Sequence, residues 1–415
     1  MLMEKHIWIY NLKFRLTCIV GFIVLSVIMV ICLVEAGVAG REIFVIINDD
    51  PERSIRTSDG NTLLSSLAEN GIYLPSACGG RGICGTCRCA VKEGGGGILP
   101  AELRHIGETE RKNHFRLACQ IKVKENLKIN LPDEIFNIKK YSATVISNEN
   151  VAPFIKELIL KLDKGRELNF KSGAYIQIDI PGYELSFKEL SVSEKYRESW
   201  NKVNLWNLKA RSEEPVFRAY SMANPPSEKN VLRFTIRIAT PPAGKKEISP
   251  GISSSYIFNL KSGDNVTLTG PYGDFFVKNT DREMCFIGGG AGMAPMRSHL
   301  LDQLLTVKTK RKVTFWYGAR SKQDIFYADE FRELEKKFGN FKYHAALSEP
   351  QPEDRWEGLT GFIHQCLCDN YLVSHKDPSE IEYYLCGPPM MINAAVKMLE
   401  GLGVKPDMIA YDKFG

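Results

Sequence analysis

The chain has 415 residues, 44% of them hydrophobic, and is long enough for about three domains, each with its own core. Its 54 Lys and Arg residues outnumber its 49 Asp and Glu residues by five, and neither sign gathers into a block. No stripe of basic and aromatic residues is present, so the composition does not indicate a nucleic-acid-binding protein. No repeat at a solenoid period occurs, which excludes a repeat architecture.

The first segment, residues 1–40, contains an uncharged run at residues 16–34. A run of this length can cross the hydrocarbon of a bilayer as one helix, and we predict a single transmembrane helix there. A cleaved signal peptide is the alternative, because Lys13 and Arg15 precede the run and small residues follow it. The run is longer than a usual signal core, which favours the anchor. Basic residues flank both sides equally, so charge leaves the orientation open.

Four cysteines in the next segment, residues 41–135, have the spacing of an iron–sulfur ligand set. Cys78, Cys84 and Cys87 share one glycine-rich loop, and Cys119 follows 32 residues after Cys87. Four such thiolates suit a [2Fe-2S] cluster, because the loop wraps two irons from one side and the remote cysteine closes the other. The loop glycines would supply positive φ angles and bare amides directed at sulfur: Gly79, Gly80, Gly82 and Gly85.

Two other interpretations of these cysteines are weaker. A four-cysteine zinc site usually has two close pairs rather than a triplet and a remote single. Disulfides are disfavoured because the 11 cysteines are odd in number and lack a repeated spacing. Cys89 follows Cys87 by two in an apparent strand, so we interpret it as a small packed residue. Around the loop, residues 43–47 and the segment near Ser54 predict a hairpin, and residues 62–70 predict a helix that Gly71 ends.

A second domain is predicted at residues 138–278. Four segments alternate like strands and are separated by turn residues, which indicates an antiparallel barrel: residues 141–147, 155–162, 175–180 and 231–238. A polar segment between them, about residues 183–214, has the pattern of an insertion rather than of a barrel strand.

Two motifs give this barrel a flavin site. In the first, strand alternation places Arg218 and Tyr220 on one face. There the Arg218 cation would bind pyrophosphate and the Tyr220 ring would cover the flavin. Ser221, the next residue, would then lie near flavin N5. In the second, Gly251 leads into an apparent helix from Ser254, whose free amides and hydroxyls, with that of Ser255, attract phosphate. Alone, each motif also fits an exposed cross-strand pair or a helix N-cap. Their order, just before a nucleotide domain, favours FAD.

The third domain, residues 281–415, has the pattern of a Rossmann-like parallel sheet. A buried strand at residues 284–287 runs into a glycine turn and a helix start, although the glycine spacing departs from G-x-G-x-x-G. Residues 313–318 and 383–387 are further strands that end in glycine turns, where open α/β sheets bind ligands. Cys386 would face this site, with a buried structural cysteine as the alternative. The predicted nucleotide-binding residues are Gly288, Gly289, Gly290, Ala291, Gly292, Met293, Cys386, Gly387 and Pro388.

The order of these motifs resembles the ferredoxin-NADP reductase superfamily. With the uncharged run, a ferredoxin-like segment ahead of the flavin domain and the insertion, nearly the whole chain resembles the F subunits of sodium-translocating NADH:quinone reductases. The stretches that carry the resemblance are residues 218–224, 237–242, 288–299 and 386–391. It implies a multidomain α+β and α/β protein: a transmembrane helix, a β-grasp ferredoxin domain, an antiparallel β-barrel FAD domain and a Rossmann-like NAD domain.

The resemblance also implies the cofactors and their ligands. FAD would be held by Arg218, Tyr220, Ser221, Gly251, Ser254, Ser255 and a terminal aromatic at Phe414, and one [2Fe-2S] cluster by Cys78, Cys84, Cys87 and Cys119. NADH would be the substrate. The tail departs from the family in Lys413, which replaces an acid, so an acidic role there is not carried over. Ser221 and Cys386, the predicted catalytic residues, would position the two rings rather than act as nucleophiles.

The implied function is electron entry to a bacterial respiratory sodium pump. FAD would take a hydride from NADH, and a [2Fe-2S] cluster would pass single electrons to membrane subunits and quinone. The chain would be a single-pass protein of the bacterial inner membrane with its soluble domains in the cytoplasm. The predicted span contains no acid or other set of ion ligands, so sodium transport would lie in other subunits.

Two alternatives stay open. A membrane-anchored NAD(P)H reductase component of an oxygenase system can have the same three modules, and a non-catalytic metal-binding scaffold would use the glycine turns structurally. The choice between NADH and NADPH also stays open, because Arg320 and Lys322 can equally meet a 2′-phosphate.

Overall fold

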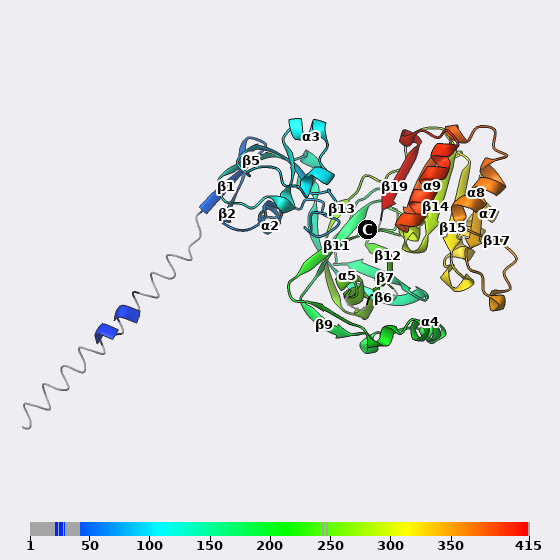
Figure 1. The fold of residues 1–415 in the computed structure, drawn as a ribbon, viewed down its shortest axis with the longest axis horizontal. Helices are drawn as coiled ribbons and strands as arrows, with labels where there is room; N and C mark the ends of the chain where they lie inside the picture. The colour runs from blue at the N-terminus through cyan, green and yellow to red at the C-terminus, as the bar shows by residue number, and fades with distance from the viewer. Residues whose placement is uncertain are drawn as a thin grey trace, which may run out of the picture. The chain divides into compact units, whose positions relative to one another are not determined.

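A computed structural model of the chain describes residues 21–23, 25–27, 29, 42–242, 245 and 248–413 (Figure 1). The chain divides into two compact units. One comprises the residues up to Asn70 together with Arg88–Leu131, and the other comprises Gly71–Cys87 together with the residues from Pro132 onward. The loop that carries three of the four predicted cluster cysteines therefore belongs to the second unit.

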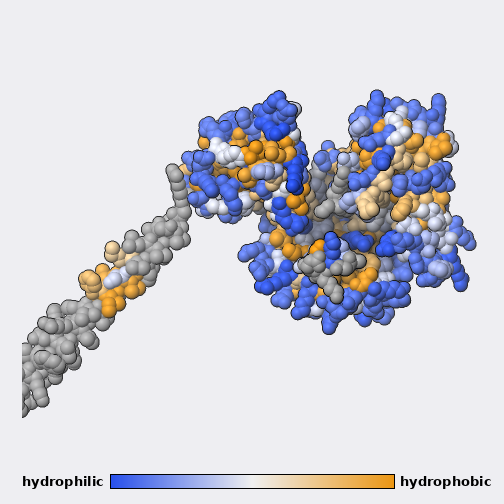
Figure 2. Space-filling view, in the orientation of Figure 1, coloured by the Kyte–Doolittle hydropathy of each residue, from blue (hydrophilic) through white to orange (hydrophobic). Residues whose placement is uncertain are grey.

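The described residues of the amino-terminal segment, between positions 21 and 29, are helical. Their apolar side chains face outward; Phe22 is 78% exposed and Leu25 is 70% exposed, and Figure 2 shows hydrophobic surface here. Within the part of the chain that the structure describes, no helix has the length and apolarity that crossing a membrane requires. Most of the predicted span at residues 16–34 lies outside the described residues, as does Phe414.

The first unit is built on a five-stranded sheet with strand order β2-β1-β5-β3-β4. β1 and β5 run parallel, and the other neighbours are antiparallel. Asn48 and Asp49, both with positive φ, form the tight turn of the predicted hairpin. The strands are β1 (Glu42–Ile47), β2 (Asp50–Ser58), β3 (Arg88–Glu93), β4 (Phe115–Leu117) and β5 (Leu127–Asn130).

The helix predicted at residues 62–70 is confirmed as α2 (Leu63–Glu69). The Thr62 hydroxyl accepts a hydrogen bond from the Ser65 amide at the start, and Gly71 follows the end with φ of 79°. α2 contacts β2 and the short turn η2 (Ala118–Gln120), and a second short helix, α3 (Glu108–Lys112), contacts β4. A mixed sheet with a helix packed on it is the β-grasp arrangement that the resemblance implies.

A buried ion pair fixes the approach to Cys119. Arg116 donates to both carboxylate oxygens of Glu102, at 2.9 and 2.8 Å, and Glu102 also accepts from the Leu117 amide at 2.8 Å. The Glu102 side chain is fully buried and that of Arg116 is 8% exposed. The pair therefore ties β4 to the preceding loop, two residues before Cys119.

We predict that Glu102→Ala lowers the free energy of unfolding of this unit by about 3–5 kcal/mol, because the change leaves a buried guanidinium without its counter-charge. Urea denaturation followed by circular dichroism measures the effect. Glu93→Ala is the control, since it removes a 2.5 Å pair with Lys128 that is largely exposed and is expected to cost less than about 1 kcal/mol. Equal losses in the two variants would contradict the prediction.

The second unit contains a six-stranded antiparallel sheet with order β11-β8-β13-β6-β7-β12. The Ala223 amide, just after β11, donates to the Arg233 carbonyl of β12 at 2.7 Å, which brings the two edges together as a barrel. The four predicted strands are confirmed, and β11 and β13 complete the sheet. The strands are β6 (Lys139–Ala152), β7 (Ile155–Leu162), β8 (Tyr175–Ile180), β11 (Val216–Ser221), β12 (Val231–Arg237) and β13 (Asn265–Tyr272).

The predicted insertion lies outside the barrel sheet. It forms a hairpin of β9 (Tyr183–Ser186) and β10 (Lys209–Ser212) with helix α4 (Arg197–Lys202) between them. Trp200 of α4 is fully buried, and its indole donates to the Pro153 carbonyl at 2.7 Å. Phe258 of helix α5 (Ile252–Asn259) belongs to the same hydrophobic core. The insertion is thus packed against α5, which begins two residues before the predicted start at Ser254.

The rest of the second unit is a parallel sheet with order β17-β16-β15-β14-β18-β19. Its order reverses at β14, the arrangement of a Rossmann-like fold. α6 and α7 cover one face, and α8 and α9 cover the other. The elements are β14 (Met284–Gly289), α6 (Met293–Leu301), β15 (Val313–Ala319), α7 (Ala328–Lys337), β16 (Phe341–Leu347), β17 (Leu359–Thr360), α8 (Ile363–Leu367), β18 (Glu382–Gly387), α9 (Pro389–Gly401) and β19 (Ile409–Lys413).

Candidate cofactor and nucleotide sites

The two predicted catalytic residues both lie next to Asp412. Ser221, the last residue of β11, donates from Oγ to Asp412 Oδ2 at 3.1 Å. Asp412 is in β19, where it pairs in register with Cys386 of β18. The hydrogen bond joins the barrel to the carboxyl edge of the parallel sheet. Sequence reasoning did not select Asp412; the available signal was its position two residues before the terminal aromatic.

Burial sets the protonation states of this group. It raises the pKa of Asp412 to about 6, with the charge of Asp274 adding to the rise and the hydrogen bond from Ser221 opposing it. Burial also raises the pKa of Cys386 well above its usual value, and the Asp412 charge adds to that. Cys386 is therefore a thiol at neutral pH, which fits a residue that positions a ring and not one that attacks as a thiolate.

We predict that Asp412→Asn stabilises the protein at neutral pH. The folded chain keeps the Asp412 proton up to about pH 6, whereas the unfolded chain loses it near pH 4, so the wild type loses stability as pH rises through this window. Asn does not titrate, and the free energy of unfolding of the variant should exceed that of the wild type by up to about 3 kcal/mol at pH 7.5. Urea midpoints at pH 4.5 and 7.5 measure this; a gain that is constant with pH would contradict it.

The loop of residues 71–87 has the geometry expected of a thiolate cradle. Cys84 donates to Cys78 Sγ at 3.3 Å, and the amides of Ile83, Cys84 and Arg81 also point at Cys78. The Cys84 thiol contributes most to lowering the pKa of Cys78, with burial opposing it, and the same hydrogen bond, followed by burial, raises the pKa of Cys84. All four predicted loop glycines have positive φ, from 66° to 84°: Gly79, Gly80, Gly82 and Gly85. These features fit a [2Fe-2S] cluster, which takes thiolate ligands.

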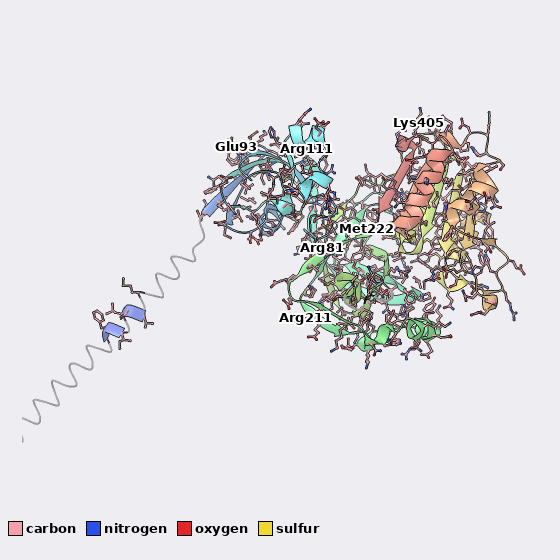
Figure 3. The ribbon with its side chains drawn as sticks, viewed as in Figure 1. Arg81, Glu93, Arg111, Arg211, Met222 and Lys405 are labelled. Atoms are coloured by element: carbon pink, nitrogen blue, oxygen red, sulfur yellow. The ribbon has the colours of Figure 1, made fainter. Side chains whose placement is uncertain are left out.

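The same loop packs on the flavin-side strands of its own unit. A Cβ on Gly79 would lie 2.1 Å from Arg218 Nη1 and 2.3 Å from the Phe217 carbonyl oxygen, so no larger residue fits there. Gln177 of β8 donates to the Leu74 carbonyl at 3.2 Å. Figure 3 labels Arg81, on this loop, and Met222, just after β11. The loop therefore borders the strand that ends at Ser221.

The remaining cysteines of interest lie in the first unit. Cys119 is in η2 and is 5% exposed, and the side-chain amide of Gln120 donates from Nε2 to its sulfur at 3.4 Å. Cys89, in β3, is 1% exposed, and burial raises its pKa to about 12, consistent with the predicted packing role. Among the described residues, no three His, Cys, Asp or Glu side chains are arranged around one metal ion. The four-cysteine ligand set of the two-iron cluster stays a prediction.

The two flavin motifs contain a cation without an ion-pair partner and hydroxyls without hydrogen-bond partners of good geometry among the described residues, and an anion could bind to both. Arg218 forms no ion pair with a described residue, and burial, followed by the charge of Arg81, lowers its pKa. The Ser253 and Ser255 hydroxyls, in the first turn of α5, are buried and have no hydrogen-bond partner of good geometry among the described residues; the Tyr220 phenol lies beside Ser253. No side chain caps the start of α5. These groups fit the pyrophosphate of FAD.

The opposite end of α5 is capped from the barrel. Asn148 donates to the Ile257 and Leu260 carbonyls at 2.7 and 2.9 Å, and Lys156 donates to the Phe258 carbonyl at 3.0 Å. Lys156 is 2% exposed, and burial lowers its pKa to about 8. A buried cation at the carboxyl end of a helix stabilises the helix dipole. The helix is thus held at one end and open to an anion at the other.

The glycine turn after β14 has the tight backbone packing that a dinucleotide-binding turn needs. A Cβ on Gly292 would lie 2.1 Å from the Cys386 carbonyl oxygen, so glycine is required for the turn to pack on β18. Gly290 has φ of 55° and open space where its Cβ would be. Thr235 of the barrel holds the Ala291 carbonyl at 3.2 Å. α6 continues from the turn η7 (Gly290–Gly292), and the amide of Met293, its first residue, donates to the Gly290 and Ala291 carbonyls. The amides that remain for a pyrophosphate are therefore those of the glycine turn itself.

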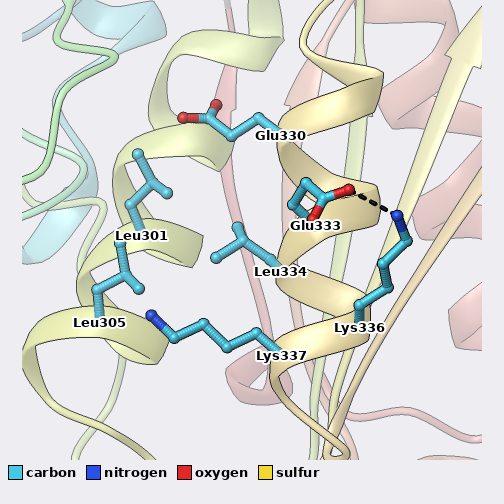
Figure 4. Close-up of a pocket in the computed structure, with 7 residues that line it drawn as sticks. All are labelled: Leu301, Leu305, Glu330, Glu333, Leu334, Lys336 and Lys337. Carbon is cyan, nitrogen blue, oxygen red and sulfur yellow. Dashed lines mark hydrogen bonds and ion pairs between the residues drawn. The ribbon is translucent and has the colours of Figure 1, made fainter.

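A hollow of about 410 Å³ lies apart from these features. Figure 4 shows it between α7 and the carboxyl end of α6, which continues into the π-helical turn η8 (Asp302–Thr306). Its walls are the side chains of Leu301, Leu305, Glu330, Glu333, Leu334, Lys336 and Lys337. The carboxyl end of α6 points away from the glycine turn, so the hollow does not belong to the nucleotide site.

Three family matches fall on the three regions described above. Residues 46–124 match the 2Fe-2S iron-sulfur cluster binding domain, residues 201–277 the oxidoreductase FAD-binding domain, and residues 286–397 the oxidoreductase NAD-binding domain. With the thiolate loop, the uncapped α5 and the glycine turn, they define an iron–sulfur flavoprotein oxidoreductase that uses a nicotinamide nucleotide. The predicted cofactors are confirmed at this level.

Full-length relatives narrow the class. The chain is 51% identical over 395 residues to the F subunit of the Na(+)-translocating NADH-quinone reductase of Serratia proteamaculans, covering 95% of this chain and 97% of the relative. It is 50% identical over 396 residues to the F subunit of the Actinobacillus succinogenes enzyme, covering 95% and 96%. The chain belongs to the family of Na(+)-translocating NADH-quinone reductase F subunits, which confirms the resemblance seen in the sequence.

Two solved structures share the fold of this chain. The ferredoxin reductase in carbazole 1,9a-dioxygenase is 27% identical, with a TM-score of 0.61, covering 90% of this chain and 99% of that one. The cytochrome P450 reductase GcoB of Amycolatopsis, 24% identical with a TM-score of 0.64, shows the same fold over 90% of this chain and 98% of its own.

Proposed function

We propose that this chain is the electron-entry subunit of a sodium-pumping respiratory NADH:quinone reductase. When bound, FAD accepts a hydride from NADH and supplies electrons one at a time to a [2Fe-2S] cluster. The observation that carries the proposal is the position of β11: its middle contacts the cysteine loop at Gly79, and its last residue hydrogen-bonds to the edge of the nucleotide-binding sheet. One six-residue strand therefore borders all three candidate sites.

We assign the residues as follows. Arg218, Tyr220 and the start of α5 bind FAD, and the turn from Gly288 to Met293 binds the pyrophosphate of NADH. Ser221 and Cys386 orient the two rings, and the half-buried Asp412 fixes the Ser221 hydroxyl through their hydrogen bond. Cys78, Cys84, Cys87 and Cys119 hold the cluster. Phe414, which lies outside the described residues, is assigned to the flavin from the family resemblance alone.

The rival function is a reductase that feeds an oxygenase. The carbazole dioxygenase reductase shares the fold at 27% identity over 90% of this chain, but the two F subunits are 51% and 50% identical to this chain over 95% of its length. NADH oxidation by membranes that contain the chain should depend on quinone and be stimulated by sodium. Activity restored by an oxygenase component, and not by quinone, would favour the rival.

The variant Cys78→Ala tests the order of electron flow. We predict that NADH still bleaches the flavin absorbance of the variant, because the flavin site lies on β11 and α5, whereas reduction of the downstream acceptor, measured as quinone reduction in membranes, falls to background and the EPR signal of the cluster is lost. Cys89→Ala is the matched control, since this buried cysteine is not a proposed ligand and should leave the signal in place. Loss of flavin reduction in Cys78→Ala would contradict the proposed order.

We further propose that residues 16–34 form the single membrane anchor, with the soluble domains in the cytoplasm of a bacterium. The outward-facing apolar side chains of Phe22 and Leu25 support this, because a lipid environment would cover them. We predict that the full chain stays in the membrane pellet after an alkaline carbonate wash, and that a chain starting at residue 41 moves to the supernatant and still oxidises NADH. Release of the full chain by the wash would contradict the anchor.

A further inference from the structure

Two oppositely charged side chains meet where β15 and β16 end. The backbone of the two strands stays paired beyond their ends, because the Ser348 amide donates to the Ala319 carbonyl at 2.9 Å and the Glu349 amide to the Arg320 carbonyl at 2.8 Å. This pairing places Glu349 beside Arg320, and Arg320 Nη2 lies 2.7 Å from Glu349 Oε2. Glu349 Oε1 has no hydrogen-bond donor among the described residues.

Lys322, the second cation at this edge of the sheet, is hydrogen-bonded to Asp354. Lys322 donates from Nζ to the Asp354 carbonyl at 3.1 Å, and its amide donates to the Asp354 carboxylate at 3.1 Å. Sequence alone offered Arg320 and Lys322 as partners for a 2′-phosphate. In the folded chain, each is held by the loop that follows β16.

The Arg320–Glu349 pair contributes little to stability. Its side chains are 69% and 58% exposed, and exposed ion pairs stabilise a fold only weakly. The pair is important for nucleotide binding because of its position in the sheet. A dinucleotide bound at the turn after β14 directs its adenosine ribose toward the end of the neighbouring strand, where an acid bonds the 2′-hydroxyl of NAD or an arginine accepts the 2′-phosphate of NADP. Here both side chains are present and are bonded to each other.

We propose that Glu349 sets selectivity for NADH over NADPH; this inference rests on the proposed function. Glu349 neutralises Arg320 and presents Oε1 to the ribose, where a 2′-hydroxyl can donate a hydrogen bond. A 2′-phosphate would have to break the ion pair and approach a carboxylate, an unfavourable contact between like charges.

The variant Glu349→Gln tests this, because it removes the charge, keeps the size of the side chain and frees Arg320. The ratio of kcat/KM for NADPH to that for NADH should rise at least about tenfold. Adding Arg320→Ala to this variant should abolish the rise. The control is Glu333→Gln, which breaks an exposed pair with Lys336 on α7, 2.6 Å long and drawn in Figure 4, and should leave the ratio unchanged.

A binding measurement makes the result independent of electron transfer. Calorimetry with 2′-phospho-AMP and with AMP on the FAD-loaded protein should show a similar gain in relative affinity for the 2′-phosphorylated ligand in Glu349→Gln, and no gain in the double variant. An unchanged ratio in Glu349→Gln, or a gain that persists without Arg320, would overturn the inference. A wild-type protein that oxidises neither nucleotide would overturn the proposed function, while the two AMP ligands would still decide the selectivity.

Discussion

The hydrogen bond between Ser221 and Asp412 is the contact on which the geometry of the active region depends. It connects the last residue of a barrel strand to an edge strand of the parallel sheet, and both ends lie in regular structure. The barrel and the sheet are also joined by the contacts of Arg297 and Ser298 in α6, which donate to the Ala223 and Asn224 carbonyls at 2.8 Å. β19 and α6 therefore hold the parallel sheet at a fixed distance and orientation from the barrel.

Two helices of the second unit, α5 and α6, start next to the candidate cofactor and nucleotide sites. α5 starts after Gly251 without a side-chain cap, which leaves its first amides without a helical partner, whereas α6 continues from the turn η7 (Gly290–Gly292), whose carbonyls accept from the Met293 amide. At the carboxyl end of α5, Asn148 and Lys156 donate hydrogen bonds to the last carbonyls of the helix. The insertion packs on that same end through Phe258. The long polar insertion thus helps to hold the flavin-side helix in place.

Much of this architecture could be predicted from the sequence, because local patterns determine it. Alternating apolar residues predicted four barrel strands, and the cysteine and glycine spacing predicted a loop with positive φ angles, as found at Gly79 and Gly85. β16, β17 and β19 were not predicted. β17 has only two residues, and β19 ends in polar residues whose strand pairing depends on β18.

The sequence could not reveal contacts between distant residues. Asp412 meets Ser221 from 191 positions away, and its place before the terminal aromatic indicates neither this hydrogen bond nor the raised pKa of its carboxyl. Glu349 is one of many exposed acids until strand pairing sets it beside Arg320. The binding of the cysteine loop to β8 and β11 is likewise tertiary, since Gln177 and Leu74 belong to different domains by sequence pattern.

The close approach of Gly79 to Arg218 and to the Phe217 carbonyl limits which residues position 79 can hold. The hydrogen atom of the glycine and the guanidinium share a space that cannot hold a methyl group. A larger residue at position 79 would bring its Cβ to 2.3 Å from the Phe217 carbonyl oxygen, and this backbone atom cannot move aside as the end of the Arg218 side chain can. Any substitution there would therefore displace the cysteine loop or strand β11, so the close spacing of the two depends on the absence of a side chain at a single position.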